Sequence, residues 1–250
     1  MTGSDFNVYV AKNDKGQTPS LHHINEVLAK YLLTLWELPV PDCAIIDVDI
    51  SLLSDQELSN NHRVLNYQRP CFGSRWVENA IDVNDFLSIN DRKTFNKILN
   101  PKDFLRFALF DEWVQNDDRK PSNYNLIMEP KSGKFKITAI DHAFIFESLA
   151  YSNLDAEHYS PKSNDHLLIS NLGNLIIDKT LIDNQLITAE REYFYLYITK
   201  CEEHFKDILD EINRFYPVSD EDSLAVRQYL FNSNRNQLVF NEHTHRLINA

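Results

Sequence analysis

The 250-residue chain carries 37 acidic and 25 basic side chains, for a net charge of −12. This excess of negative charge argues against a binder of duplex nucleic acid or of an anionic membrane, because phosphates and acidic headgroups repel such a surface. Apolar residues make up 43% of the chain, which favours a packed core over disorder. The three cysteines are isolated, so we expect neither a disulfide framework nor a zinc site. With no apolar leader or membrane-length segment in the sequence, we expect a cytoplasmic protein.

The first 50 residues predict a strand, a helix and a second strand. Residues 6–12 are aromatic and β-branched, with the alternation of a half-buried strand. Ser20 can cap a helix that runs to about Trp36 and stops before Pro39. Residues 43–50 alternate again, as a second strand would.

The remainder of the chain predicts mainly helices around one hairpin. Polar residues near 80–85 mark a hinge between an N-terminal lobe, residues 1–80, and a C-terminal lobe, residues 81–250. We expect four further elements: a helix from Pro101, a hairpin over residues 125–140, a long helix over residues 188–215 capped by Thr188, and a helix from Ser219 to Leu230. This order indicates an α+β fold of the two-lobed, protein-kinase-like type, with a reduced N-terminal lobe and a mostly helical C-terminal lobe.

The loop after the Pro101 helix carries the most specific motif. Asp118 is followed five positions later by Asn123, and Asp141 then ends the apolar return strand of the hairpin. Protein-kinase-like enzymes use this order of an Asp, an Asn and a strand-end Asp. We predict that Asp118 accepts or orients the proton of an acceptor hydroxyl, while Asn123 and Asp141 supply oxygen ligands for magnesium. Arg119 is placed to brace the loop through a neighbouring carboxylate or carbonyl group.

Two alternatives apply to this loop. Asp117 competes for the role of the base, but its spacing to Asn123 is one residue too long. The run from Asn116 to Asn123 is also rich in turn-forming residues, so a plain surface turn is the simpler interpretation. The helix before the loop and the hairpin after it favour the catalytic interpretation.

Lys12 and Glu26 extend the pattern into the N-terminal lobe. Lys12 closes the first apolar strand, the position from which a kinase lysine holds nucleotide phosphates. Glu26 lies in the middle of the following helix, where the ion-pair partner of that lysine belongs. Taken alone, Lys12 is equally an exposed lysine at a strand end, and Glu26 a solvent-facing helix residue. Together with the distal motif, the pair is better explained by function.

The segments Asp118–Ile127 and Ala139–Ala143 resemble the bacterial HipA-like kinase family, particularly its short stand-alone members, and are more distantly similar to phosphatidylinositol kinases. Weaker matches extend the resemblance from Val8 to about Leu230. It implies an ATP- and magnesium-dependent kinase that transfers the γ-phosphate to a hydroxyl, as Ser/Thr-type kinases do, and some family members act as toxins or in defence. It also implies the following roles: phosphate-binding lysine, Lys12; its ion-pair partner, Glu26; catalytic base, Asp118; metal ligands, Asn123 and Asp141.

Two departures from the family pattern support an alternative. Ala143 stands where the family usually has glycine, and Gly3 is the sole glycine among the eleven residues before Lys12, where kinases place a glycine-rich hairpin. The alternative is a catalytically weak pseudokinase or a regulatory protein-binding module with a kinase-like fold. A third possibility is an unrelated α+β domain with a chance motif. The acceptor and any antitoxin-like protein partner are not specified by the sequence.

Overall fold

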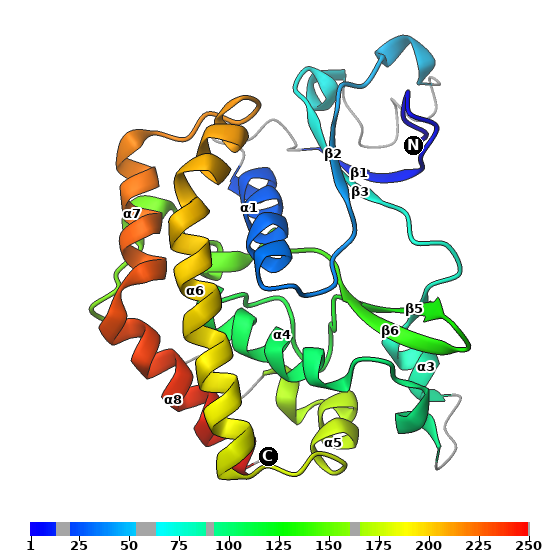
Figure 1. Cartoon of the computed structure of the whole chain (residues 1–250). Coiled ribbons are helices and arrows are strands. Elements are labelled where there is room, and N and C mark those ends of the chain that lie inside the picture. Colours follow the sequence, from blue (N-terminus) through cyan, green and yellow to red (C-terminus); the bar gives the residue numbers. More distant parts are fainter. Residues whose placement is uncertain (14–20, 54–63, 89–92, 161–165, 250) are drawn as a thin grey trace.

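A computed structural model describes residues 1–13, 21–53, 64–88, 93–160 and 166–249. The fold is α+β, as expected, with helices gathered beside two small antiparallel sheets (Figure 1). In chain order the named elements are β1 (Tyr9–Lys12), α1 (Leu21–Leu35), β2 (Cys43–Ile46), β3 (Cys71–Arg75), β4 (Ile81–Asp82), α3 (Val83–Ser88), α4 (Pro101–Val114), β5 (Leu126–Lys131), β6 (Lys134–Ala139), α5 (Asn171–Ile177), α6 (Asn184–Asn213), α7 (Asp220–Phe231) and α8 (Ser233–Asn249).

The two sheets are built from different parts of the chain. The first has the order β1-β3-β2 and the second the order β4-β5-β6, each wholly antiparallel. In Figure 1 the first sheet lies above the β5–β6 hairpin, and the stretch between β3 and β4 descends along the right-hand side to join them. The predicted hairpin is therefore present, at residues 126–139. The predicted hinge region forms β4 and the start of α3, so it is ordered into short elements.

The first strand is shorter than the sequence pattern predicted. Phe6 has a φ of 63°, which a strand residue does not adopt, and its side chain is 90% exposed. The chain instead turns back on itself: the Gly3 amide donates to the Asn7 carbonyl oxygen at 2.8 Å, and Thr2 bridges to Val8. The Asp5 carboxylate accepts a bond from the Tyr9 hydroxyl and stabilises the turn. These local bonds override the strand propensity of the aromatic residue.

Helix α1 is embedded in the main core. Its apolar residues Ile24, Leu28 and Leu32 are buried, and α1 packs on α6, as Figure 1 also shows. Just beyond its end, the indole of Trp36 is fully buried and stacks on Trp113 of α4 at 5.3 Å between ring centroids. The contacts with α4 and α6 hold α1 in one orientation. A residue on α1 therefore has a defined position relative to the loop that follows α4.

Helices α6 and α7 follow the prediction with one correction, whereas α5 and α8 were not predicted as separate elements. Helix α6 begins at Asn184, before the predicted cap Thr188, because the Asp183 carboxylate accepts the Leu186 amide at 2.8 Å. Thr188 lies inside the helix, where its hydroxyl bonds the Asn184 carbonyl oxygen. Ser219 caps α7 as predicted. Of the helices within the described ranges, none combines the length and apolarity that crossing a membrane requires.

Candidate active site

Three of the predicted site residues meet in one ion-pair cluster. The Lys12 ammonium lies 2.5 Å from Glu26 Oε1 and 2.7 Å from Asp141 Oδ1. Lys12 ends β1, Glu26 lies on α1, and Asp141 follows β6, so the fold gathers them from three separate segments. The Glu26 side chain is only 2% exposed, whereas that of Asp141 is 36% exposed. The cluster therefore has a buried side, at Glu26, and a side that faces solvent, at Asp141.

Glu26 is held in its ionised form. Burial by itself would raise the pKa of this carboxyl, but hydrogen bonds from His142 and the charge of Lys12 outweigh burial and lower it to about 2. One of those bonds runs from the His142 amide to Glu26 Oε2 at 2.9 Å. Burial likewise opposes the charge on Lys12, yet the two carboxylates raise the pKa of its ammonium. At neutral pH the cluster contains a carboxylate and an ammonium that fix one another.

Asp118 lies in the loop after α4 and is positioned by two asparagines. Its Oδ2 accepts a hydrogen bond from Asn125 Nδ2 at 2.9 Å, and its amide donates to Asn116 Oδ1 at 3.3 Å. The Asn125 carbonyl oxygen also accepts the Ile140 amide at 2.9 Å. Asn125 therefore links Asp118 to the residue that precedes Asp141. Asn125 was not predicted as a site residue, although it stands two residues after Asn123 in the motif.

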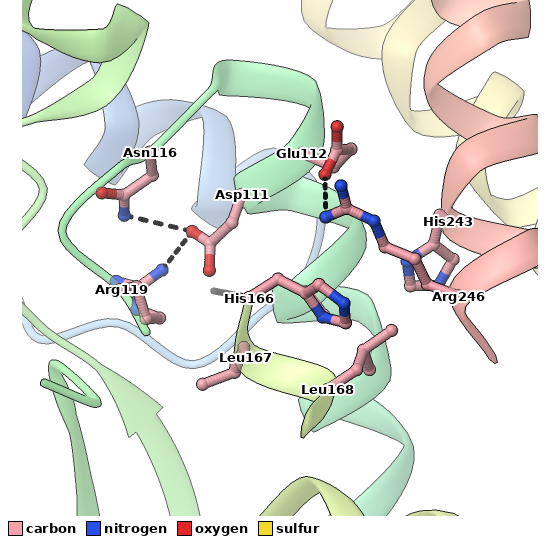
Figure 2. Close-up of a pocket in the computed structure, with 10 residues that line it drawn as sticks. Asp111, Glu112, Asn116, Arg119, His166, Leu167, Leu168, His243 and Arg246 are labelled. Carbon is pink, nitrogen blue, oxygen red and sulfur yellow. Dashed lines mark hydrogen bonds and ion pairs between the residues drawn. The ribbon is translucent and has the colours of Figure 1, made fainter. Parts of the chain in front are cut away.

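A buried network of polar and charged side chains around Asp111 of α4 also supports this loop (Figure 2). Asp111 on α4 accepts from Arg119 Nη1 at 2.5 Å and from Asn116 Nδ2 at 3.1 Å. Arg119 also donates to the Ile140 carbonyl oxygen at 3.1 Å, so the guanidinium spans a carboxylate and a carbonyl group, as expected. The pocket drawn in Figure 2 holds only about 20 Å³, room for roughly one water molecule. We assign it to the support of the loop, with no ligand of its own.

Asn123 occupies a tight turn. Its amide and carbonyl groups bond those of Lys120, both at 2.9 Å, so the two residues close a turn around Pro121 and Ser122. Within the described parts of the chain, no hydrogen bond joins its side-chain amide to Lys12, Glu26, Asp118 or Asp141. The structure thus places Asn123 on the same loop as Asp118 but brings only Lys12, Glu26 and Asp141 into direct contact.

A cavity of about 260 Å³ opens next to the ion-pair cluster. Lys12, Glu26 and Asp141 form one charged part of its lining. Arg75 and Asp82 also line it, and much of the rest is apolar. Apolar and linker residues that line it include Val10, Trp76, Val77, Ile81, Ile127 and Ile140. A cavity with an apolar body and a few convergent polar groups is the usual form of a small-molecule site. The cavity lies between the two sheets. Lys12, from the N-terminal part of the predicted motif, and Asp141, from its C-terminal part, both line it.

The comparison with protein families identifies the chain. A family model described as HipA-like kinase matches residues 2–239. The chain belongs to the HipA-like kinase family. The resemblance seen in the loop and strand-end motifs is therefore confirmed, and the match covers nearly the whole chain. No curated protein matches the chain. Kinases of this family generally use ATP and magnesium.

Proposed function

We propose that this HipA-like kinase is an ATP- and magnesium-dependent phosphotransferase that moves the γ-phosphate to a hydroxyl, with protein Ser or Thr as the acceptor. The observation that carries the proposal is the contact of Lys12 with Glu26 and Asp141 at the charged end of an apolar cavity. The cavity volume accommodates a planar base. At its charged end, Lys12 can pair with phosphates, and a bound magnesium ion would offset the two carboxylates. We further propose that the lobes comprise residues 1–80 and 81–250, with the cavity between them.

Lys12 binds the phosphates in this proposal. An ammonium group offers three donors, and Glu26 engages one side of it from a buried position. Because Glu26 is held in place by α1 and by the His142 amide, Lys12 is oriented before any ligand arrives. Such preorganisation stabilises charge that develops on the transferred group without reorganising the site.

Asp141 and Asn123 are the proposed magnesium ligands. A carboxylate and an amide oxygen match the preference of this ion, which takes few protein ligands and completes its shell with phosphate oxygens and water. Among the described residues, no three His, Cys, Asp or Glu side chains form a metal cluster by themselves, which suits an ion shared with the nucleotide. Bound there, magnesium would neutralise charge on the phosphates.

Asp118 is the proposed base. Its Oδ2 is engaged by Asn125, which leaves the other oxygen to accept the proton of an acceptor hydroxyl or to orient that hydroxyl. The backbone link from Asn125 to Ile140 couples its position to that of Asp141. Asn125 would thus set the position of the proposed base, Asp118, relative to the proposed metal ligand, Asp141.

Phosphate transfer from γ-labelled ATP tests the proposal. We expect magnesium-dependent transfer to a protein acceptor, or nucleotide consumption, that falls by about 10² to 10⁴ in Asp118→Asn, since this is the range that general base catalysis contributes. Asp117→Asn is the matched control, because Asp117 is the exposed neighbour in the same loop. Equal losses in the two variants, or no effect of Asp118→Asn on a measurable activity, would remove Asp118 from the mechanism.

A second candidate function is a regulatory module that binds nucleotide without turning it over. It is favoured by the turn before β1, where backbone hydrogen bonds tie Gly3 to Asn7 and Phe6 rather than presenting it in a run of glycines. Backbone amides of a glycine-rich loop normally cover the phosphates of a kinase. Tight Mg-ATP binding combined with no transfer to any acceptor would support this second function.

A further inference from the structure

Asn25, the neighbour of Glu26 on α1, holds the chain segment that follows Asp141. Its buried amide donates to the Ala143 carbonyl oxygen at 2.9 Å and approaches the Ile145 carbonyl oxygen at 3.4 Å. Its side-chain carbonyl oxygen accepts the Tyr151 hydroxyl at 2.7 Å. Both side chains are 2% exposed, so these bonds are protected from competing water. One side chain of α1 therefore contacts the segment at three points.

The held segment is conformationally strained. Phe146, Glu147 and Ser148 have φ values of 61°, 53° and 59°, a left-handed run that side chains with a Cβ rarely adopt. Such a conformation persists only where surrounding contacts impose it. Gln115, at the end of α4, supplies two of these contacts: its carbonyl oxygen accepts the Glu147 amide at 2.9 Å, and its Nε2 donates to Glu147 Oε1 at 3.0 Å.

The Tyr151 side chain contacts both the strained turn and α1. Its ring meets Phe146 edge to face, at 5.7 Å between centroids and an interplanar angle of 90°. The hydroxyl then reaches Asn25, so Tyr151 connects the strained turn with α1. Adjacent on the same helix, Glu26 binds the His142 amide. Two consecutive helix residues thus hold the backbone on both sides of the peptide that follows His142.

We propose that Asn25 and Tyr151 form a latch that positions Asp141 by locking the strained segment onto α1. This inference rests on the proposed function, in which Asp141 is a metal ligand next to Lys12. Asp141 itself has a φ of 56°, so the direction of its carboxylate depends on the backbone that the latch restrains. Opening the latch lets residues 146–148 relax and withdraws Asp141 from Lys12. Asn25 and Tyr151 are positioning residues in this scheme, acting through the backbone.

Tyr151→Phe tests the latch with the smallest change. It removes the hydroxyl that bonds Asn25 and keeps the ring that packs on Phe146. The matched control is Tyr216→Phe, because Tyr216 is 4% exposed and its hydroxyl donates to the Pro70 carbonyl oxygen at 3.3 Å. Amide hydrogen exchange is measured without nucleotide. We expect exchange of residues 143–149 to accelerate roughly fivefold or more in Tyr151→Phe, and to stay unchanged in Tyr216→Phe.

Steady-state kinetics separate positioning from general support of the fold. In Tyr151→Phe we expect KM for Mg-ATP to rise roughly tenfold while kcat changes less, because the latch sets the placement of a nucleotide-metal ligand rather than of the base. Asn25→Ala should shift KM in the same direction. The double variant should show less than the sum of the two effects, since the two variants share the hydrogen bond between Tyr151 and Asn25.

Three results overturn the latch. Exchange of residues 143–149 that matches the wild type in Tyr151→Phe removes its physical basis. Equal acceleration in Tyr216→Phe shows a general loss of stability, and accelerated exchange with an unchanged KM shows that the latch does not position Asp141. If the wild type fails to bind Mg-ATP, the proposed function fails and the catalytic purpose of the latch fails with it. Exchange, measured without nucleotide, still decides whether Asn25 and Tyr151 hold the segment.

Discussion

At the scale of single residues, Glu26 shows how a buried carboxylate can stay ionised. Its burial opposes ionisation, and Lys12 together with the His142 amide more than compensates. Removing one member of a buried pair leaves an uncompensated charge, so each partner constrains the others. The sequence identified Lys12, Glu26 and Asp141 by their positions along the chain. It did not identify Asn25, because its partners are backbone groups and a distant tyrosine that no spacing rule connects to it.

The lowered pKa of Glu26 predicts a specific acid sensitivity. A carboxyl whose folded pKa lies below its ordinary value of 4.5 stabilises the fold above that pH, and the contribution is lost as the pH falls toward about 2. The difference in unfolding free energy between the wild type and Glu26→Gln should therefore shrink by roughly 3 kcal/mol over that interval. Urea denaturation from pH 6 to pH 2 measures it, with the exposed Glu78→Gln as the control. Parallel curves for the wild type and Glu26→Gln would refute the coupling.

Asn125 has a left-handed backbone and a side chain that bonds Asp118, and substitutions can separate these two roles. Its φ of 46° suits Asn or Gly, whereas its side chain holds Asp118. We expect Asn125→Gly and Asn125→Ala to lower kcat alike, by about tenfold, with KM for Mg-ATP unchanged, because both remove one charge-assisted hydrogen bond to the base. Only Asn125→Ala should also lose about 1 kcal/mol of stability from the left-handed backbone. A kcat retained in Asn125→Gly would show that the backbone, not the amide, is what matters.

At the scale of elements, most helices and the hairpin were predictable because their apolar periodicity and caps are local. Ser219 caps α7 and Pro101 opens α4 as their chemistry suggests. The errors occurred where a competing local bond decides, as in the turn at Phe6 and the Asp183 cap of α6. The close approach of Gly173 to residues 167–168 was not predictable, since it depends on how a short helix meets the preceding turn.

Gly173 should tolerate no side chain. A Cβ added there would lie 2.1 Å from the Leu168 carbonyl oxygen and 2.6 Å from the Leu168 carbonyl carbon, so backbone must move. We expect Gly173→Ala to cost about 1 to 3 kcal/mol in the free energy of unfolding, measured by urea denaturation. Gly133→Asn is the control: that position has a φ of 76° and open surroundings, and Asn accepts such a backbone. Equal costs at the two positions would mean that the packing of α5 is looser than the structure indicates.

At the scale of the whole molecule, the site depends on contacts between distant segments. Helix α1 docks on α6, and Trp36 just beyond its end stacks on Trp113 of α4, which brings Glu26 to the end of β6. The order of the motif along the chain predicted that Lys12, Glu26 and Asp141 belong together, and the ion pairs of Lys12 join them. The cavity could not be inferred from order alone, because its walls come from β1, the linker after β3 and the β5–β6 hairpin. Its shape is a property of how the two sheets face each other.

Calorimetric titration of Mg-ATP tests the central claim most directly, namely that Lys12 and Asp141 form the charged end of a nucleotide site. The account predicts one molecule of Mg-ATP bound per wild-type chain, with an affinity at least about tenfold weaker in Lys12→Met, since one charge-assisted contact is worth that much. Lys131→Met, on the exposed hairpin turn, should bind as the wild type does. Absence of binding to the wild type, or equal affinity in Lys12→Met, would contradict the account.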